Sequence, residues 1–241
     1  MSAEPLGVSE GSTPGIGSEG QSRRRFLRRA AVAGAVGRTV PTILTMSPAG
    51  AVGSCTLTLD WDTFTVGTVF TSTTISGVTV SLTVVPIAAP PTTLLATNRT
   101  IRAAPNGSFP QQVLQFQMLP NATGIGQTIT FSFSSSVQTV KFSFYDIDNL
   151  TGGWGDRIQM NTAGYTSTFP AGTTVIDAGA AGNLFRNSQV SNNLNANSNQ
   201  GNPGISYAGP ISSFQFVYSN AANTGGGNQR IGISDITFDK C

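Results

Sequence analysis

The chain has 241 residues, a low charged content of 10% and a formal net charge of +2 at neutral pH. Most of the basic excess lies near the N-terminus: residues 52–241 carry seven Lys or Arg against eight Asp, a net charge of −1, so we expect no nucleic-acid partner. The chain has no histidine, and residues 52–241 have no glutamate. This excludes a Ser-His-Asp triad and an imidazole zinc site, and it leaves only aspartate pairs for acid–base catalysis. We therefore expect a non-catalytic protein, with an Asp-based carbohydrate-active enzyme as a less favoured alternative.

The N-terminal segment carries the first motif. Residues 22–28 are Ser-Arg-Arg-Arg-Phe-Leu-Arg, and a weakly apolar stretch rich in Ala and Gly follows them. Arg23, Arg24, Phe26 and Leu27 match the pattern S-R-R-x-F-L-K, so the segment resembles the twin-arginine (Tat) signal peptide of bacteria. The resemblance implies export by the Tat machinery and a secreted, extracellular protein. No run approaches the roughly 20 apolar residues of a membrane-spanning helix, so we expect no transmembrane segment. A basic arm for nucleic acid would explain the arginines but not the Phe-Leu pair.

Two sites compete for the end of this signal. Ala49-Gly50-Ala51 has the A-x-A form of a signal-peptidase site and predicts cleavage after Ala51, which would remove residues 1–51 and leave 52–241 as one domain. Val52-Gly53-Ser54-Cys55 is a loose lipobox, which would instead make Cys55 a lipid anchor. Cys241 is the only other cysteine, and a widely spaced pair in an exported protein predicts a Cys55–Cys241 disulfide. Two unpaired thiols are the alternative.

After Cys55 the sequence is dominated by a period of two. Apolar residues alternate with Thr, Ser or Gln, which predicts strands with one buried and one solvated face. The segments are 55–61, 78–84, 114–118, 129–133, 140–144, 214–218 and 231–233. The apolar positions change from odd-numbered residues (Ile231, Ile233) to even-numbered ones (Ile236, Phe238), which predicts a bulge near Ser234-Asp235. The Pro-rich segment 88–110 and the Asn-rich segment 183–204 are predicted to be irregular surface segments. With no helical stripe, the prediction is an all-β, antiparallel, jelly-roll-like β-sandwich of one domain.

Three aspartates surround one glycine loop in FSFYDIDNLTGGWGDRIQM, residues 142–160. Asp146 and Asp148 continue the series of every second residue to which the core-facing Phe142 and Phe144 belong, so they would point to the same face of the strand. Because an unpaired carboxylate is costly in a core, we expect both at the rim, where the strand leaves the sheet, with Asp156 across the loop. Calcium takes six to eight oxygen ligands, so these three aspartates predict a structural Ca²⁺ site. The alternative is that they accept hydrogen bonds from turn amides and pair with Arg157.

Two stretches resemble a known class of module. Residues 137–158, VQTVKFSFYDIDNLTGGWGDRI, look like the strand–DID–loop–DR segment of β-sandwich modules in bacterial secreted and surface proteins, and 231–238, IGISDITF, resemble their final strand. The resemblance implies a binding or structural role. We expect a module that binds a glycan or another surface polymer, with Trp61, Trp154 and Tyr145 as stacking faces unless they only pack. The alternative is a structural or adhesive cell-envelope protein without a small ligand.

Overall fold

The structure is a computed structural model, and it describes residues 55–88, 91–119, 122–177, 184–188, 193–195, 198–221 and 229–241. The export signal predicted at residues 22–28 and the cleavage site after Ala51 lie outside the described residues. Within the described part, the only helical element is a single 3₁₀ turn, η2 (Trp61–Thr63), and no helix there is long and apolar enough to cross a membrane. The all-β prediction is confirmed.

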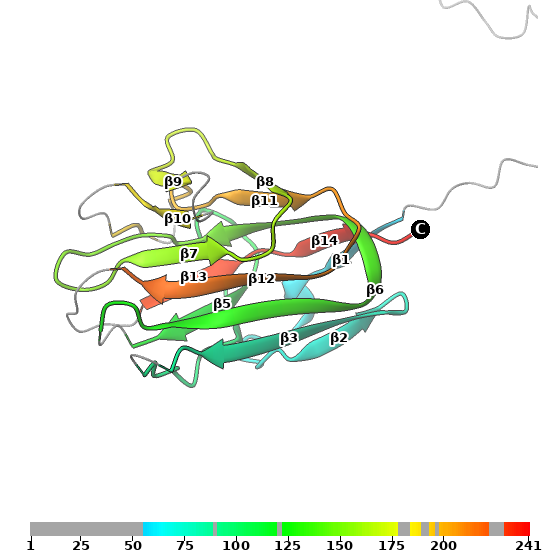
Figure 1. The fold of residues 1–241 in the computed structure, drawn as a ribbon, viewed down its shortest axis with the longest axis horizontal. Coiled ribbons are helices and arrows are strands. Elements are labelled where there is room, and N and C mark those ends of the chain that lie inside the picture. The colour runs from blue at the N-terminus through cyan, green and yellow to red at the C-terminus, as the bar shows by residue number, and fades with distance from the viewer. Residues whose placement is uncertain are drawn as a thin grey trace, which may run out of the picture. The chain divides into compact units, whose positions relative to one another are not determined.

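Over the described residues, fourteen antiparallel strands form one continuous hydrogen-bonded sheet that curls around its core (Figure 1). The main path runs β4-β5-β13-β6-β12-β7-β10-β9, and β3, β11 and β14 also pair with β6. Because the strands are joined in one sheet, the finer expectation of a jelly-roll-like sandwich stays a prediction. The strands are β1 (Thr56–Leu59), β2 (Ser72–Ile75), β3 (Val78–Pro86), β4 (Thr100–Arg102), β5 (Val113–Met118), β6 (Gly126–Tyr145), β7 (Asp156–Met160), β8 (Tyr165–Thr168), β9 (Val175–Asp177), β10 (Leu184–Asn187), β11 (Gly204–Tyr207), β12 (Ile211–Asn220), β13 (Gln229–Ile233) and β14 (Ile236–Asp239).

Strand β6 organises the domain. The sequence predicts two strands here, at 129–133 and 140–144, but the structure has a single strand of 20 residues. Its first half pairs with β3 and β12, and its second half pairs with β11, β13 and β14. Figure 1 shows β6 bending at one end of the domain and running back. Thr139, in the second half of β6, has a positive φ of 49°, an uncommon conformation for a β-branched residue. No Gly or Pro interrupts 127–145, so the chain bends without leaving the sheet.

Stacked aromatic rings fill the space between the two halves of β6. Phe214 of β12 stacks on Phe131 of the first half at 4.9 Å and on Phe142 of the second half at 4.6 Å between ring centroids. Phe144 meets Phe216 edge-on at 4.9 Å. These residues are all buried. Both halves of β6 therefore turn their alternating apolar side chains toward the core, as the period of two predicted.

The tertiary structure adds strands where composition predicted irregular chain. The Asn-rich segment contains β10, whose Phe185 is fully buried, and the Pro-rich segment contains β4, which pairs with β5. In both places a strand of three or four residues forms because a neighbouring edge offers it hydrogen bonds. The bulge predicted near Ser234-Asp235 is instead a break between β13 and β14, which pair with β5 and β1 respectively.

The face of β5 that was predicted to be solvated is buried. Gln115 and Gln117 are only 6% and 5% exposed, and their amides form a network with Asn98. Asn98 Oδ1 accepts from the Gln117 backbone N–H at 2.8 Å, and Gln115 Nε2 donates to Gln117 Oε1 at 2.9 Å. The amides satisfy one another, so polar side chains are tolerated without solvent.

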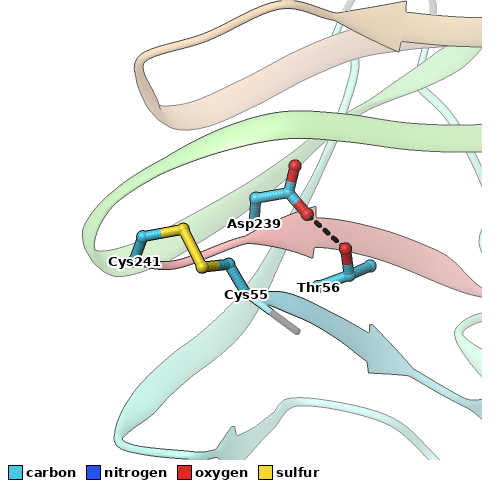
Figure 2. The surroundings of a disulfide bond; sticks show 4 residues. All are labelled: Cys55, Thr56, Asp239 and Cys241. Carbon is cyan, nitrogen blue, oxygen red and sulfur yellow. Dashed lines mark hydrogen bonds between the residues drawn. A yellow bond between two sulfur atoms is a disulfide. The ribbon is translucent and has the colours of Figure 1, made fainter. Parts of the chain in front are cut away.

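The predicted Cys55–Cys241 disulfide is present in the structure (Figure 2). The two Cα atoms are 5.1 Å apart, since β1 pairs with β14 and brings the two cysteines together. Thr56 Oγ1 donates to Asp239 Oδ1 at 2.6 Å, and the Lys240 N–H donates to the Cys55 carbonyl at 2.8 Å. The first and last strands of the described chain are therefore joined by a covalent bond as well as by strand pairing.

Candidate functional site

The candidate site lies on the loop between β6 and β7. The Leu150 N–H donates to the Trp154 carbonyl and the Gly153 N–H donates to the Leu150 carbonyl, both at 2.8 Å. Gly152 adopts φ 73°, a conformation that L side chains rarely adopt. This tight turn brings Trp154 back toward Asp148, near the start of the same loop.

Asp156, at the start of β7, is buried under a set of hydrogen-bond donors. Its Oδ1 accepts from the Tyr218 hydroxyl at 2.7 Å and from Gln229 Nε2 at 2.9 Å, and its Oδ2 accepts from the Asp148 N–H at 3.1 Å. The side chain is 1% exposed. Burial and the neighbouring Asp148 charge raise the pKa of Asp156 well above its usual range.

Asp148 connects two loops through its carboxylate. Its Oδ1 accepts from Trp154 Nε1 at 2.8 Å, and its Oδ2 accepts from the Leu194 N–H at 3.0 Å. Burial, with a smaller contribution from the charge of Asp146, raises the pKa of Asp148 to about 6. The indole of Trp154 is therefore held in one orientation by a buried carboxyl group.

Asp146 lies between two arginines from other strands. Its Oδ2 is 3.6 Å from Nε of Arg230 in β13 and 3.9 Å from a guanidinium nitrogen of Arg102 in β4. Burial is the larger influence and raises the pKa of Asp146, while both arginines oppose it. The expected partner, Arg157, is exposed, and the ion pairs of Asp146 in the described structure are with the other two arginines. No sequence pattern indicated this pairing, because β4 and β13 are far from the loop in sequence.

These contacts bear on the calcium prediction. Asp146 and Asp148 were expected at the rim, with Asp156 across the loop. Asp148 and Asp156 are instead buried, and both accept hydrogen bonds from protein donors. Among the residues that the structure describes, no group of three or more potential ligands is placed to hold a metal ion. The Ca²⁺ site on Asp146, Asp148 and Asp156 stays a prediction. The alternative agrees with the structure in part: Asp148 and Asp156 accept hydrogen bonds, but the ion pairs among the described residues are those of Asp146 with Arg102 and Arg230.

Three aromatic residues were predicted as stacking faces, and of these Trp154 lines the cavities described below. Trp61 is fully buried, and its Nε1 donates to the Ser234 carbonyl at 2.7 Å. Tyr145 is 2% exposed and packs against Phe109 with ring centroids 4.8 Å apart. Both are packing residues, whereas Trp154 is half-buried.

Two cavities meet at the Trp154 side chain. A cavity of about 310 Å³ is lined by Trp154 together with Asn149, Thr151, Arg186 and Ser188 among others. A second cavity, of about 250 Å³, is lined by Trp154, Asp146, Asp148, Asn193, Leu194 and Arg230. Trp154 thus lines one cavity with amide and hydroxyl groups, Arg186 and the buried Asp156, and another cavity with Asp146, Asp148 and Arg230. Concave surfaces with an aromatic face and a few polar groups are typical ligand sites.

The carboxyl oxygens of Asp148 and Asp156 are all engaged within the protein. All four oxygens of Asp148 and Asp156 accept from protein donors, and three backbone or indole N–H groups are among those donors. A general acid or nucleophile needs an oxygen directed at the substrate. The arginines that line the cavities were missed in the sequence, because single basic residues in short strands carry no local signal.

Comparisons of the chain with protein-family models, with curated proteins and with solved structures find no match.

Proposed function

We propose that this protein is an exported, non-catalytic extracellular module that binds a glycan or another surface polymer at Trp154. The observation that carries the proposal is the half-buried indole, fixed by Asp148 and bordered by two polar cavities. An aromatic face with a fixed orientation loses little conformational entropy on binding and suits the C–H face of a sugar ring. Asn149, Thr151 and Ser188 supply amide and hydroxyl groups beside it for sugar hydroxyls.

Export by the Tat machinery, with cleavage after Ala51, is part of the same proposal. The disulfide supports it, because disulfides persist in oxidising compartments outside the cytosol. It also supports free secretion over a lipid anchor, since the sulfur of Cys55 cannot carry both a disulfide and a lipid thioether. Tat substrates are exported folded, and the pairing of β1 with β14 would place the two sulfurs before they oxidise.

Binding is tested with immobilised polysaccharides and with tryptophan fluorescence. The chain has two tryptophans, and Trp61 is fully buried, so a change in quenching on ligand addition reports on Trp154. We expect retention on at least one polymer, loss of retention in Trp154→Ala, and unchanged retention in Phe169→Ala, a partly exposed aromatic elsewhere. Trp154→Phe keeps the ring without the N–H and should retain part of the affinity.

Retention on no polymer, with a folded protein, would reject the binding proposal. It would favour the second function class, a structural or adhesive cell-envelope protein without a small ligand. Retention that is equal in Trp154→Ala and in the native protein would place the binding surface elsewhere.

A further inference from the structure

Two exposed arginines lie directly opposite one another on neighbouring strands. Arg157 of β7 and Arg186 of β10 are Cα partners in the antiparallel register, and both side chains are exposed. Directly opposed residues share one face of the sheet, with Cβ atoms roughly 4.5–5.5 Å apart, and like charges in this arrangement repel. The remaining neighbour of Arg157 in this row is Ser219 of β12, which is neutral.

No carboxylate among the described side chains balances this pair. The ion pairs of the described residues are those of Arg102 and Arg230 with Asp146. Two arginine side chains therefore leave the same face of the sheet from directly opposed positions, in a domain whose residues 52–241 carry a net charge of −1. An anion that approached this face would be attracted by both groups and would relieve their repulsion.

One arginine of the pair, Arg186, also lines the cavity of the proposed site. It lines the 310 Å³ cavity together with Trp154, Asn149 and Ser188. Asp156 also lines this cavity, but it is only 1% exposed and its Oδ1 already accepts hydrogen bonds from Tyr218 and Gln229. The second cavity that Trp154 lines has the carboxylates Asp146 and Asp148, and its one arginine, Arg230, is already paired with Asp146. An anionic group on a bound sugar is therefore directed to the Arg186 side, where the planar guanidinium can hold a carboxylate through two parallel hydrogen bonds.

We propose that the polymer is an acidic polysaccharide built from uronic acid residues. One sugar ring lies against Trp154, its carboxylate binds Arg186, and the carboxylate of a following residue lies over Arg157. The proposal rests on the proposed glycan-binding function and names its substrate class. A carboxylate attached to the ring suits a site in which the aromatic face and the cation line one cavity.

The test compares uronate polymers with their uncharged forms. Polygalacturonate, alginate and hyaluronate, and the methyl ester of each, are titrated into the full chain, and Trp154 fluorescence is measured. We expect saturable binding of at least one uronate polymer, with a dissociation constant at least about tenfold lower than for its ester. Arg186→Gln should raise that constant about tenfold and remove the preference, and Arg157→Gln should have a smaller effect in the same direction.

Two controls separate this from general charge effects and from unfolding. Lys141→Gln removes an equal charge from an exposed site on β6 and should leave binding unchanged. Arg186→Gln should melt at the native temperature or above it, because it removes a repulsive neighbour. Polyphosphate should not compete for the site at equal charge concentration.

The failures of the two proposals differ. Equal affinity for uronate and ester, an Arg186→Gln variant that binds like the native protein, or full competition by polyphosphate would overturn the acidic-glycan inference. If Trp154→Ala still abolished binding in those cases, the glycan-binding function would stand. If no polymer, acidic or neutral, changed the fluorescence or was retained, both proposals would be rejected.

Discussion

Mild acidification should stabilise this protein, although carboxylates in folded proteins more often do the opposite. Burial raises the pKa of Asp148 from 3.8 to about 6, and it raises the pKa of Asp156 further above its usual range. A carboxyl group whose pKa is higher in the folded than in the unfolded state binds its proton more tightly when folded. Its contribution to the free energy of unfolding is therefore fully present below about pH 4 and is lost as the pH rises through 6.

The magnitude follows from the Asp148 shift. Two pKa units correspond to about 3 kcal/mol in total, but only the part between pH 7 and pH 5 is tested. For a group with folded and unfolded values of about 6 and 3.8, that part is about 1 kcal/mol. The shifts of Asp156, Asp146 and Asp235 have the same direction and add to it. A domain of this size should gain roughly 2–4 °C in melting temperature per kcal/mol.

The assay is thermal unfolding at pH 7 and pH 5 at fixed ionic strength, with a chelator present so that no metal contributes. Asp148→Asn cannot take up the proton, so the gain between the two pH values should shrink by about 1 kcal/mol. Its absolute stability will also change, because an amide cannot accept both hydrogen bonds of Asp148, so the pH difference is the readout. The exposed Asp62→Asn is the control and should keep most of the gain, because its charge contributes only a minor part of the Asp235 shift. A melting temperature that is flat or falls on acidification, or an Asp148→Asn variant with the native gain, would refute the reasoning.

Three further predictions concern the bridge, the signal and calcium. Replacing Cys55 and Cys241 by Ser should lower the free energy of unfolding by about 2–5 kcal/mol, since the bridge spans 186 positions of chain; both cysteines alkylated without reduction would contradict the disulfide. Replacing Arg23 and Arg24 by Lys should retain precursor in the cell, as followed by immunoblotting, and normal export would reject the Tat interpretation. Melting temperatures in millimolar Ca²⁺ and in chelator should differ by several degrees, and Asp148→Ala should abolish the difference. Identical melts would leave the three aspartates as hydrogen-bond acceptors.

The strands of the core were predictable because their signal is local. Alternation such as that in Ile129–Phe133 and Phe214–Tyr218 marks one buried face, whichever strand lies alongside. Strands β4 and β10 were not predictable, because three or four residues among Pro or Asn carry no period, and pairing partners far along the chain stabilise them. The same holds for Gln115 and Gln117, whose burial depends on the Asn98 loop.

Some residues of the candidate site could also be predicted from the sequence. Asp146, Asp148 and Asp156 stood out as carboxylates around one glycine loop, and the structure places all three near Trp154 or its neighbours. Their environment was not predictable. An exposed calcium site and a buried, hydrogen-bonded pair have the same local sequence, because the donors on Tyr218 and on Leu194 come from other strands and loops.

By itself, the sequence determined the all-β class, the cysteines available for a bridge, and the chemistry that is absent, since composition and a period of two need no knowledge of neighbours. Only the tertiary structure decided that β6 bends through both halves of the sheet, that Trp154 borders two cavities, and that Arg157 lies opposite Arg186. Strand register and burial result from contacts between residues far apart along the chain, and these contacts are settled only when the whole sheet closes around its aromatic core.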